Sequence, residues 1–389
     1  MFKILTYNTI SPLGLARLPR DHFEVASEIQ HPDAILLRSQ DLHGVPIPDS
    51  VKAVGRAGAG TNNIPVADYT ERGIPVFNAP GANANAVKEL VIAGLLLAAR
   101  HIPDAWHFAR GLEGDDAGIQ QQVEKGKKRF AGYELAGKTI GVLGLGAIGV
   151  KVANAADALG LKVIGFDPLL TVESAWQLSS SAIRARSVEE LVANADFISL
   201  HIPLNEHTRK LLDAERLEAV KPGAVLLNFS RGGVVDEAGV IQQLNSGRLS
   251  AYVTDFPSRA LLNQPHAIVL PHLGASTTEA EENCAVMVAD QVRDFLENGN
   301  IRHAVNFPDV ILPRNGAQGR LAVANRNVPN MVGQITGALA EAQINIIDLV
   351  NKSQGDYAYT LIDVGSDIPD ETLNRIRTVE GVLSARPVF

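Results

Sequence analysis

Short apolar segments alternate with helical patterns along most of the chain. Apolar runs at 3–7, 34–37, 52–55 and 75–77 have the length and composition of buried strands, and a helical stretch runs from about 84 to 100. Strands that alternate with helices are typical of βα units that build a parallel sheet. We therefore predict a doubly wound α/β sheet at the start of the chain.

A second βα series is predicted after a break in this pattern. The break, at 111–132, is polar and rich in glycine and lysine, and we interpret it as a long loop or arm. An amphipathic helix at 277–298 follows the series and would return the chain to the first unit. The strands of this series are expected at 139–143, 162–167, 196–200, 224–229, 251–255 and 267–270.

The last part of the chain has a pattern of its own, after a linker rich in proline. Its elements are expected in the order βαββαβ, which is the order of a ferredoxin-like fold. The strands are expected at 320–324, 344–351, 357–364 and 382–387, and the helices at 329–342 and 370–378.

The composition narrows the class of protein. Apolar residues make up 46% of the 389 residues and the formal net charge is -8, which gives no support for binding to nucleic acid. The single Cys284 excludes an intramolecular disulfide and a cysteine zinc cluster, and no metal site is predicted. The longest apolar run, at 90–99, is too short to span a membrane, and no signal peptide is evident, so a cytoplasmic protein is expected.

A glycine motif at 144–149 lies between a predicted strand and a predicted helix. Gly144 permits a tight turn, Gly146 lets the backbone approach a pyrophosphate, and Gly149 lets the helix pack closely on the strand. This context is typical of a dinucleotide-binding Rossmann unit, although a glycine turn without a ligand is the alternative.

Other residues of this unit suit the same cofactor. Ala147 and Ile148 begin a helix whose N-terminus favours the anionic pyrophosphate. Asp167 ends the next strand, 18 residues after Gly149, and can accept hydrogen bonds from both ribose hydroxyls. Its carboxylate would repel a 2′-phosphate, so NAD is predicted in preference to NADP.

Three polar residues follow other strands of this series. Arg231 suits a carboxylate held by two parallel hydrogen bonds, and a surface ion pair is the alternative. His272 suits the proton transfer that oxidation of an alcohol requires, because histidine titrates near neutral pH. We interpret His201 as a buried turn residue, and Pro203 beside it as part of the wall of the nicotinamide pocket.

From these predictions we expect two Rossmann-like doubly wound domains and one smaller ferredoxin-like domain. The first domain is expected at 1–95 together with 281–305, and the cofactor-binding domain at 96–280. A linker at 306–316 and the ferredoxin-like domain at 317–389 complete the chain.

Taken together, the motifs resemble the D-2-hydroxyacid dehydrogenase family, and most closely its phosphoglycerate dehydrogenase branch. Segments 56–64 and 73–81 match the family's substrate loop and the block after it, and the glycine, Arg231 and His272 motifs follow in the family's order. The resemblance covers essentially the whole chain. It implies NAD-dependent oxidation of 3-phospho-D-glycerate to 3-phosphohydroxypyruvate, the first step of serine synthesis.

The resemblance also implies roles for single residues. Arg231 would bind the carboxylate and carbonyl oxygen of the substrate, and His272 would be the acid/base. Asp255 would accept a hydrogen bond from the nicotinamide carboxamide, with Gly274 also at the cofactor. The substrate contacts would be the backbone amides near Ala57 and Gly58 for the carboxylate, and Arg56 and Asn83 for the phosphate.

One departure from the family concerns the partner of the histidine. The family has a glutamate that pairs with its catalytic histidine, and Arg259 stands about where that glutamate is expected. Another carboxylate could replace it, His272 could work unpaired, or the alignment could slip by a residue. The glutamate's role is therefore left unfilled.

The last domain resembles an ACT domain, a small-molecule sensor. Asn327 and Asn345 match two serine-binding positions of bacterial relatives, whereas Asn325 stands where a histidine is expected and Asn330 where a glycine is expected. A serine effector is the resulting hypothesis, and a dimerisation domain without a ligand is the alternative.

Two other functions are kept open. The chain could reduce glyoxylate, hydroxypyruvate or another 2-keto acid, or it could be an inactive regulator that senses NADH, which the missing glutamate leaves conceivable. The expected partners are a small-molecule substrate and other copies of the chain, in a homodimer or homotetramer.

Overall fold

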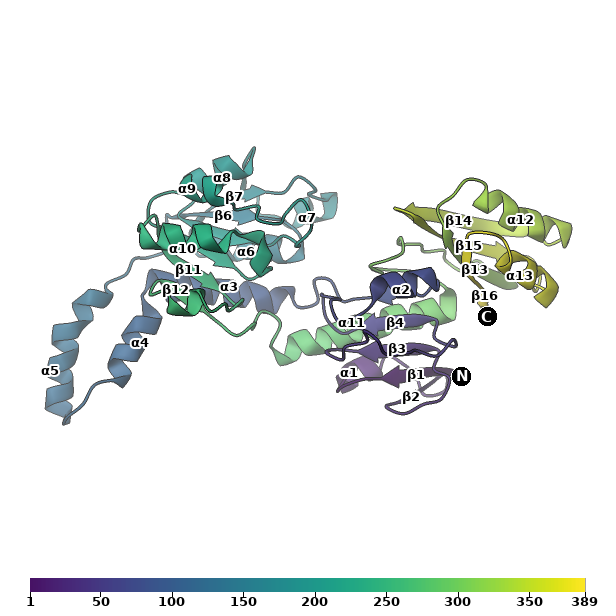
Figure 1. The fold of residues 1–389 in the computed structure, drawn as a ribbon, viewed down its shortest axis with the longest axis horizontal. Coiled ribbons are helices and arrows are strands. Elements are labelled where there is room, and N and C mark those ends of the chain that lie inside the picture. The colour runs from purple at the N-terminus through teal and green to yellow at the C-terminus, as the bar shows by residue number, and fades with distance from the viewer. Residues whose placement is uncertain (389) are drawn as a thin grey trace. The chain divides into compact units, whose positions relative to one another are not determined.

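The computed structural model describes residues 1–388 and contains two compact units. Unit 1 combines Met1–Asn83 with Thr278–Phe389, and unit 2 is Ala84–Thr277 (Figure 1). The expected boundary at 95 lies inside helix α3 (Ala84–Ala99), which belongs entirely to unit 2. Helix α3 belongs to unit 2 because its buried side packs into the hydrophobic core of the unit 2 sheet.

The first part of unit 1 is a parallel sheet with the strand order β2-β1-β3-β4-β5. Its strands are β1 (Phe2–Thr6), β2 (Phe23–Ala26), β3 (Ala34–Leu37), β4 (Ala53–Arg56) and β5 (Val76–Phe77). Its helices are α1 (Pro12–Leu15), α2 (Val66–Glu71) and the 21-residue α11 (Thr278–Asn298). The return of the chain through α11 is confirmed, whereas β2 was not predicted, because its four residues mix a charge with apolar side chains.

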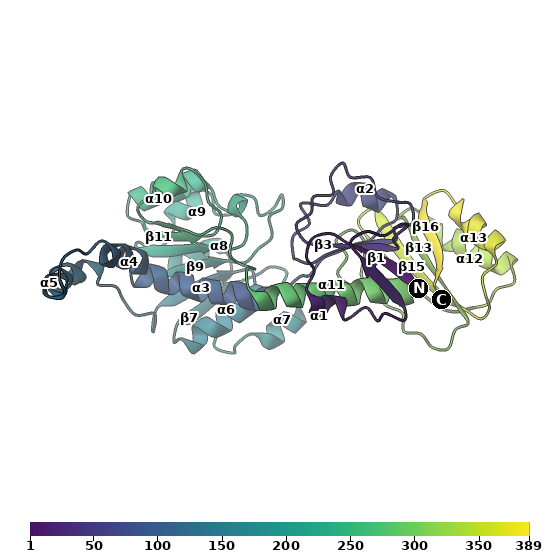
Figure 2. The same cartoon turned by 90° about the horizontal axis from the view of Figure 1, so that it is seen from below.

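Unit 2 is a seven-stranded parallel sheet with the order β12-β11-β10-β9-β6-β7-β8. The strands are β6 (Thr139–Leu143), β7 (Lys162–Phe166), β8 (Ile183–Arg184), β9 (Phe197–Leu200), β10 (Ala224–Asn228), β11 (Leu249–Thr254) and β12 (Ala267–Val269). The helices are α3, α6 (Ala147–Ala158), α7 (Val172–Gln177), α8 (Val188–Asn194), α9 (Ala214–Glu218) and α10 (Glu237–Asn245), with short 3-10 turns η2 (Gly232–Val234) and η3 (Leu261–Asn263). Helices α3 and α6 cover one face of the sheet and α8, α9 and α10 cover the other (Figure 2).

The segment at 111–132, expected to be a long loop or arm, forms part of an arm, but it is largely helical rather than a loop. Helices α4 (Ile102–Arg110) and α5 (Asp116–Gly126) and the turn η1 (Lys127–Phe130) form an arm that extends from the sheet of unit 2 (Figure 1). The side chain of Asp115 caps α5 by accepting a hydrogen bond from the Gly118 amide at 2.9 Å. No residue of α4 or α5 is buried.

The C-terminal part of unit 1 has the predicted ferredoxin-like topology. Its antiparallel sheet has the order β14-β15-β13-β16. The elements are β13 (Gly319–Arg326), α12 (Met331–Glu341), β14 (Ile346–Gln354), β15 (Tyr357–Val364), α13 (Asp370–Arg377) and β16 (Val382–Val388). One face of this sheet packs on α12 and α13, and the other shares a core with α11. The expected linker also contributes to that core, because Phe307, Val310 and Leu312 are buried in it.

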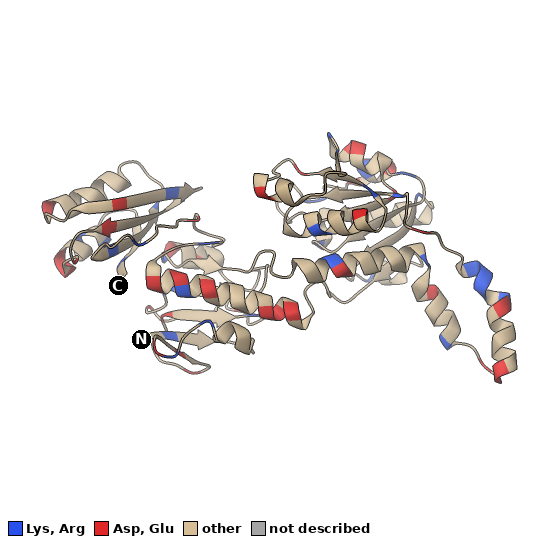
Figure 3. Ribbon diagram, turned by 180° about the vertical axis from the view of Figure 1, so that it is seen from behind, with Lys and Arg blue, Asp and Glu red and all other residues tan. Residues whose placement is uncertain are grey.

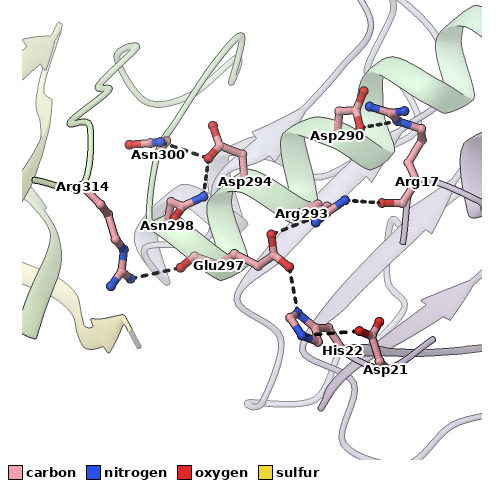
Figure 4. Close-up of polar contacts among 10 residues, drawn as sticks. All are labelled: Arg17, Asp21, His22, Asp290, Arg293, Asp294, Glu297, Asn298, Asn300 and Arg314. Carbon is pink, nitrogen blue, oxygen red and sulfur yellow. Dashed lines mark hydrogen bonds and ion pairs between the residues drawn. The ribbon is translucent and has the colours of Figure 1, made fainter. Parts of the chain in front are cut away.

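Side chains from the C-terminal part hold the end of α11. Backbone carbonyls at a helix C-terminus have no partner within the helix and need donors from elsewhere. Four carbonyls here accept hydrogen bonds from side chains, and Figure 4 shows one of them, between Arg314 and Glu297. The pairs are Arg386 with the Phe295 carbonyl at 2.5 Å, Arg314 with Glu297 at 3.1 Å, Arg320 with Asn298 at 2.8 Å and Tyr359 with Gly299 at 2.8 Å.

The surface carries both signs of charge. Several acidic side chains lie along α11, and lysine and arginine gather where α5 meets η1 (Figure 3). Within residues 1–388 no helix combines the length and the hydropathy needed to cross a membrane. The same residues contain no group of three or more histidine, cysteine or acidic side chains placed to hold a metal ion.

Removal of Arg320 is expected to destabilise the protein strongly. Arg320 and Asp363 are both buried at 1% exposure and form two hydrogen bonds, of 2.5 and 2.8 Å. Arg320→Met leaves a buried carboxylate without its cation, at a cost of about 3–5 kcal/mol in the free energy of unfolding. Urea denaturation measures this loss of unfolding free energy. The double variant Arg320→Met/Asp363→Leu, which removes both charges, should recover much of it. A double variant less stable than the single one would contradict this account.

Candidate active site

Most of the predicted site residues of unit 2 lie at one edge of its sheet. All strands of this sheet are parallel, so their carboxyl ends meet at the same edge, where ligands of open α/β sheets bind. The residues at or just beyond these ends are Gly144 after β6, Asp167 after β7, His201 after β9, Arg231 after β10, Asp255 after β11 and His272 after β12.

The glycine turn between β6 and α6 has the close contacts that only glycine allows. Gly144 has a φ of +88°, and a Cβ there would lie 2.4 Å from the His201 carbonyl oxygen. A Cβ on Gly149 would lie 1.9 Å from the Gly144 carbonyl oxygen, so the helix packs directly on the turn. Nothing lies within 4 Å of the Cβ position of Gly146, at the N-terminus of α6. The turn therefore leaves open space beside unpaired helix amides, as an anion site requires.

Asp167 is held in place by the backbone. One carboxylate oxygen accepts a hydrogen bond from the Leu145 amide and the other from the Leu169 amide, both at 2.8 Å. A carboxylate oxygen accepts more than one hydrogen bond, so both remain able to bind hydroxyl groups. The geometry fits the predicted ribose contact.

Asp255 carries a buried oxygen without a partner. Its Oδ2 accepts a hydrogen bond from the Gly274 amide at 2.9 Å, whereas its Oδ1 is buried and has no hydrogen-bond partner among residues 1–388. Burial raises the pKa of the Asp255 carboxyl, and the Gly274 amide opposes this. A buried acceptor of this kind fits an amide donor, such as the carboxamide of nicotinamide.

Arg231 and His272 occupy exposed turns. The Arg231 guanidinium is exposed, and its Nη1 donates to the Ser230 carbonyl at 2.7 Å. His272 has a φ of +49°, in the left-handed region that residues other than glycine seldom adopt. Its backbone amide donates to the Asp255 carbonyl at 3.0 Å.

The immediate neighbour of the His272 ring is aromatic. The ring of Phe256 lies 5.1 Å away, between centroids, at an interplanar angle of 52°. Within the described residues His272 forms no ion pair with a carboxylate, and its proximity tends to lower the pKa of the Asp255 carboxyl. Arg259 is exposed, and its carbonyl accepts from Asn263.

His201 has the surroundings of a structural residue. Its Nε2 lies 2.8 Å from the Ser199 hydroxyl, and its Nδ1 is buried without a partner among residues 1–388. Burial lowers the pKa of His201 to about 3. A neutral ring of this kind fits the interpretation as a buried turn residue. Pro203 is exposed, and its carbonyl accepts from Thr208 at 2.5 Å.

In unit 1 the expected substrate loop follows β4. The Arg56 Nε donates to Asn63 at 2.9 Å, and its Nη1 lies 2.4 Å from where a Cβ on Gly58 would be, so glycine makes room for the guanidinium. The amides expected to bind the carboxylate are engaged, because Ala57 donates to the Leu37 carbonyl and Gly58 to the Arg56 carbonyl, both at 2.8 Å. A carboxylate would have to displace these bonds or use amides further along the loop.

Two other side chains belong to this region. Asn83 has a buried Oδ1 without a partner among residues 1–388. Arg38, which sequence reasoning missed, directly follows β3, and its carbonyl accepts from Asn63 of the Arg56 loop at 3.2 Å. Its guanidinium pairs with Glu281 at 2.6 Å. Its position directly after the apolar run at 34–37 could have marked Arg38 as a candidate, but a single arginine outside any motif does not point to a site.

The three asparagines of the C-terminal part differ in their surroundings. Asn325 is 1% exposed, and its Oδ1 has no hydrogen-bond partner among residues 1–388. The Asn327 side chain donates to the Gly355 carbonyl at 3.0 Å. Asn345 is exposed, and its carbonyl accepts from the Gly365 amide. Only Asn325 therefore presents a buried acceptor that a ligand would satisfy.

A cavity of about 470 Å³ lies elsewhere in unit 2. Its walls come from the junction of α3 and α4, from Tyr133 and from β12 with the residues before it. None of the residues predicted to bind cofactor or substrate lines it, so it is separate from the candidate site.

Known proteins are similar to this chain in sequence and in fold. Residues 95–274 match the D-isomer specific 2-hydroxyacid dehydrogenase, NAD binding domain. The chain is 32% identical to D-3-phosphoglycerate dehydrogenase of Haemophilus influenzae over 87% of this chain and 81% of that protein. It is 33% identical to the enzyme of that name from Methanocaldococcus jannaschii over 84% of this chain, but spans only 61% of that longer protein.

A solved structure is also similar. The NAD+-bound 3-phosphoglycerate dehydrogenase of Entamoeba histolytica matches with a TM-score of 0.60 at 26% identity, over 78% of this chain and 98% of that one. The similarity therefore extends well beyond the matched NAD-binding domain.

The stability of the protein should depend on pH through His201. Its pKa is about 3 in the folded protein against 6.5 for an ordinary histidine, so the unfolded chain binds the proton more tightly. The stability that the folded protein gains from keeping His201 neutral is complete above about pH 6.5 and is lost as the pH falls toward 3. Between pH 7.5 and 5.5 the unfolding free energy of wild type should fall by about 1.4 kcal/mol relative to His201→Gln. Denaturant titrations at both values measure this, and a parallel response of the two proteins would refute it.

Proposed function

We propose that this chain, which belongs to the D-isomer-specific 2-hydroxyacid dehydrogenase family, oxidises 3-phospho-D-glycerate to 3-phosphohydroxypyruvate with NAD. As a member of this family it is an NAD-dependent D-2-hydroxyacid dehydrogenase. The proposal concerns the substrate, its place at the start of serine synthesis and the residues that act on it.

The observation that carries the choice of a phosphorylated acid is a pair of arginines in unit 1. Arg38 follows β3 and Arg56 ends β4, and these strands are neighbours in the parallel sheet, with Leu37 opposite Arg56. Arginine is well suited to phosphate because its planar donors match the phosphate oxygens. The relatives that bear the name D-3-phosphoglycerate dehydrogenase support the same choice.

The residues of unit 2 supply the proposed chemistry. Arg231 binds the substrate carboxylate through two parallel hydrogen bonds and so orients the carbon that reacts. His272 takes the hydroxyl proton in the oxidation and returns it in the reverse direction. NAD, when bound, supplies the hydride acceptor.

The cofactor contacts follow from the same geometry. The turn at Gly146, with Ala147 and Ile148, holds the pyrophosphate by helix amides, and Asp167 holds the ribose. The free oxygen of Asp255 holds the carboxamide.

We also propose that the ferredoxin-like part is an ACT domain that binds serine. The support is the buried, unpartnered Oδ1 of Asn325, close in the chain to Asn327, and the matching position of Asn345. A buried acceptor without a partner is costly unless a ligand or water satisfies it. A serine ammonium group would do so.

The proposed active form is a homodimer or homotetramer. Helices α4 and α5 have no buried residue, and Trp106 of α4 is 63% exposed. Helices with one apolar side are stable when that side is covered, so an arm of this kind favours contact with another copy.

The substrate is tested by the rate of NADH consumption with phosphohydroxypyruvate, hydroxypyruvate, glyoxylate, pyruvate and 2-oxoglutarate. We expect phosphohydroxypyruvate to have the highest kcat/KM, and Arg56→Met to raise its KM at least about tenfold while changing the KM for pyruvate little. A preference for an unphosphorylated acid would contradict the proposed role in serine synthesis, while the chain would remain a 2-hydroxyacid dehydrogenase. Binding of NADH without turnover of any acid would favour a regulator.

Replacement of His272 should abolish turnover without loss of the cofactor. His272→Ala removes the only proposed acid/base, and the rate should fall by about a hundredfold or more. NADH affinity, followed by fluorescence, should stay within about twofold, because no cofactor contact is proposed for the ring. His207→Ala, at an exposed position of the same unit, is the matched control. If His272→Ala retains turnover, His272 is not the acid/base of the reaction.

Serine at millimolar concentration should slow the enzyme and raise its melting temperature. Ligands that bind only the folded state stabilise it in proportion to their occupancy. Asn327→Ala should abolish both effects and leave the rate without serine unchanged. If serine alters neither the rate nor the melting temperature of wild type, the domain is structural.

A further inference from the structure

Beyond the residues that touch substrate or cofactor, we propose that a buried polar network of Asn228, Tyr252 and Thr254 positions Arg231 and His272 together. The inference rests on the proposed roles of those two residues in the reaction. The three members of the network are positioning residues, since none of them is placed to touch the reacting atoms.

The network lies inside an apolar layer. Asn228 ends β10 and Thr254 ends β11, and the two are directly opposite in the parallel register, with Tyr252 opposite Leu226 on the same side. Their exposed fractions are 0% for Asn228, 0% for Thr254 and 1% for Tyr252. The surrounding side chains under α8, α9 and α10 are aliphatic. Polar groups in such a layer destabilise a fold unless each has a partner, so their retention requires an explanation.

One branch of the network holds the turn that carries Arg231. The Asn228 Nδ2 donates to the Arg231 carbonyl at 3.0 Å and to the Tyr252 hydroxyl at 3.3 Å. Its Oδ1 accepts from the Ser230 amide at 3.2 Å and from the Ser230 hydroxyl at 2.9 Å. A single amide group thus ties Ser230 and Arg231 to the end of the strand, which sets the direction in which the arginine leaves the sheet.

The other branch leads toward His272. The Thr254 hydroxyl donates to the Asn228 carbonyl at 2.9 Å and accepts from the Phe256 amide at 3.2 Å. The Phe256 ring packs against the His272 ring, and the carbonyl of the intervening Asp255 accepts from the His272 amide. The hydroxyl of Thr254 therefore sets the turn on which the histidine rests.

Both branches meet at the residue Asn228, the Arg231 branch through its side-chain amide and the His272 branch through its backbone carbonyl. The sheet itself does not need these side chains, because its ladder is made of backbone hydrogen bonds and its core of aliphatic groups. Burial raises the pKa of the Tyr252 hydroxyl, so it stays a neutral hydrogen-bonding group while the enzyme works. This arrangement supplies rigidity where the histidine has no carboxylate partner.

The experiment removes one hydroxyl from each branch without changing the shape of the residue. Thr254→Val leaves the Phe256 amide and the Asn228 carbonyl short of a partner, and kcat should fall about tenfold or more, with KM changed by less than about threefold. Tyr252→Phe loosens the Arg231 branch, and KM should rise about threefold to tenfold with kcat nearly unchanged. Thr254→Ser keeps the hydroxyl and should restore a rate close to that of wild type.

The outcomes separate this inference from the proposed function. Steady-state rates with the best 2-keto acid and NADH affinity are measured for wild type and all three variants. Opposite shifts in kcat and KM for Thr254→Val and Tyr252→Phe, with rescue by Thr254→Ser, support the inference. Wild-type kinetics in both Thr254→Val and Tyr252→Phe would overturn this inference and leave the proposed function intact. An equal loss of rate in Thr254→Val and Thr254→Ser would do the same. A wild type that turns over no 2-keto acid overturns the proposed function, and this inference with it.

Discussion

The C-terminal end of α11 is the point on which the assembly of unit 1 depends. The carbonyls at and just after the end of this 21-residue helix accept hydrogen bonds from three arginines and a tyrosine that lie between residues 314 and 386. Cationic donors at a helix C-terminus also complement its dipole. Because the same sheet face shares an apolar core with α11, the ferredoxin-like part is joined to the first sheet as one compact body.

In unit 2 the corresponding constraint is the common direction of the strands. Seven parallel strands bring their carboxyl ends to one edge, so residues far apart in the sequence, such as Gly144 and His272, share that edge. The strand interiors are apolar, whereas the last positions of β10 and β11 are Asn228 and Thr254. Polar side chains are buried at this edge because they satisfy the turns that carry the functional groups.

The region around His272 is organised by an aromatic contact and a backbone hydrogen bond. Without a paired carboxylate, the imidazole rests against Phe256, and its backbone is bonded to Asp255. Asp255 in turn keeps one buried oxygen free, which burial makes costly and a cofactor amide would satisfy. The same short segment therefore packs against the histidine and holds a buried acceptor without a partner, a combination that depends on the backbone path rather than on side-chain identity alone.

The sequence by itself determined the elements and the site motifs, because apolar periodicity and glycine spacing are local properties. Strands such as Thr139–Leu143 and Tyr357–Val364 have the bounds that their apolar runs predict. Helices α4 and α5 within the arm were not predicted as helices, and neither has a buried residue. Only the tertiary structure decided that α3 belongs to unit 2, that Ala57 and Gly58 already use their amides, and that Asn228 joins two turns. These facts depend on contacts between distant segments, and no local pattern encodes which donor meets which acceptor once the chain is packed.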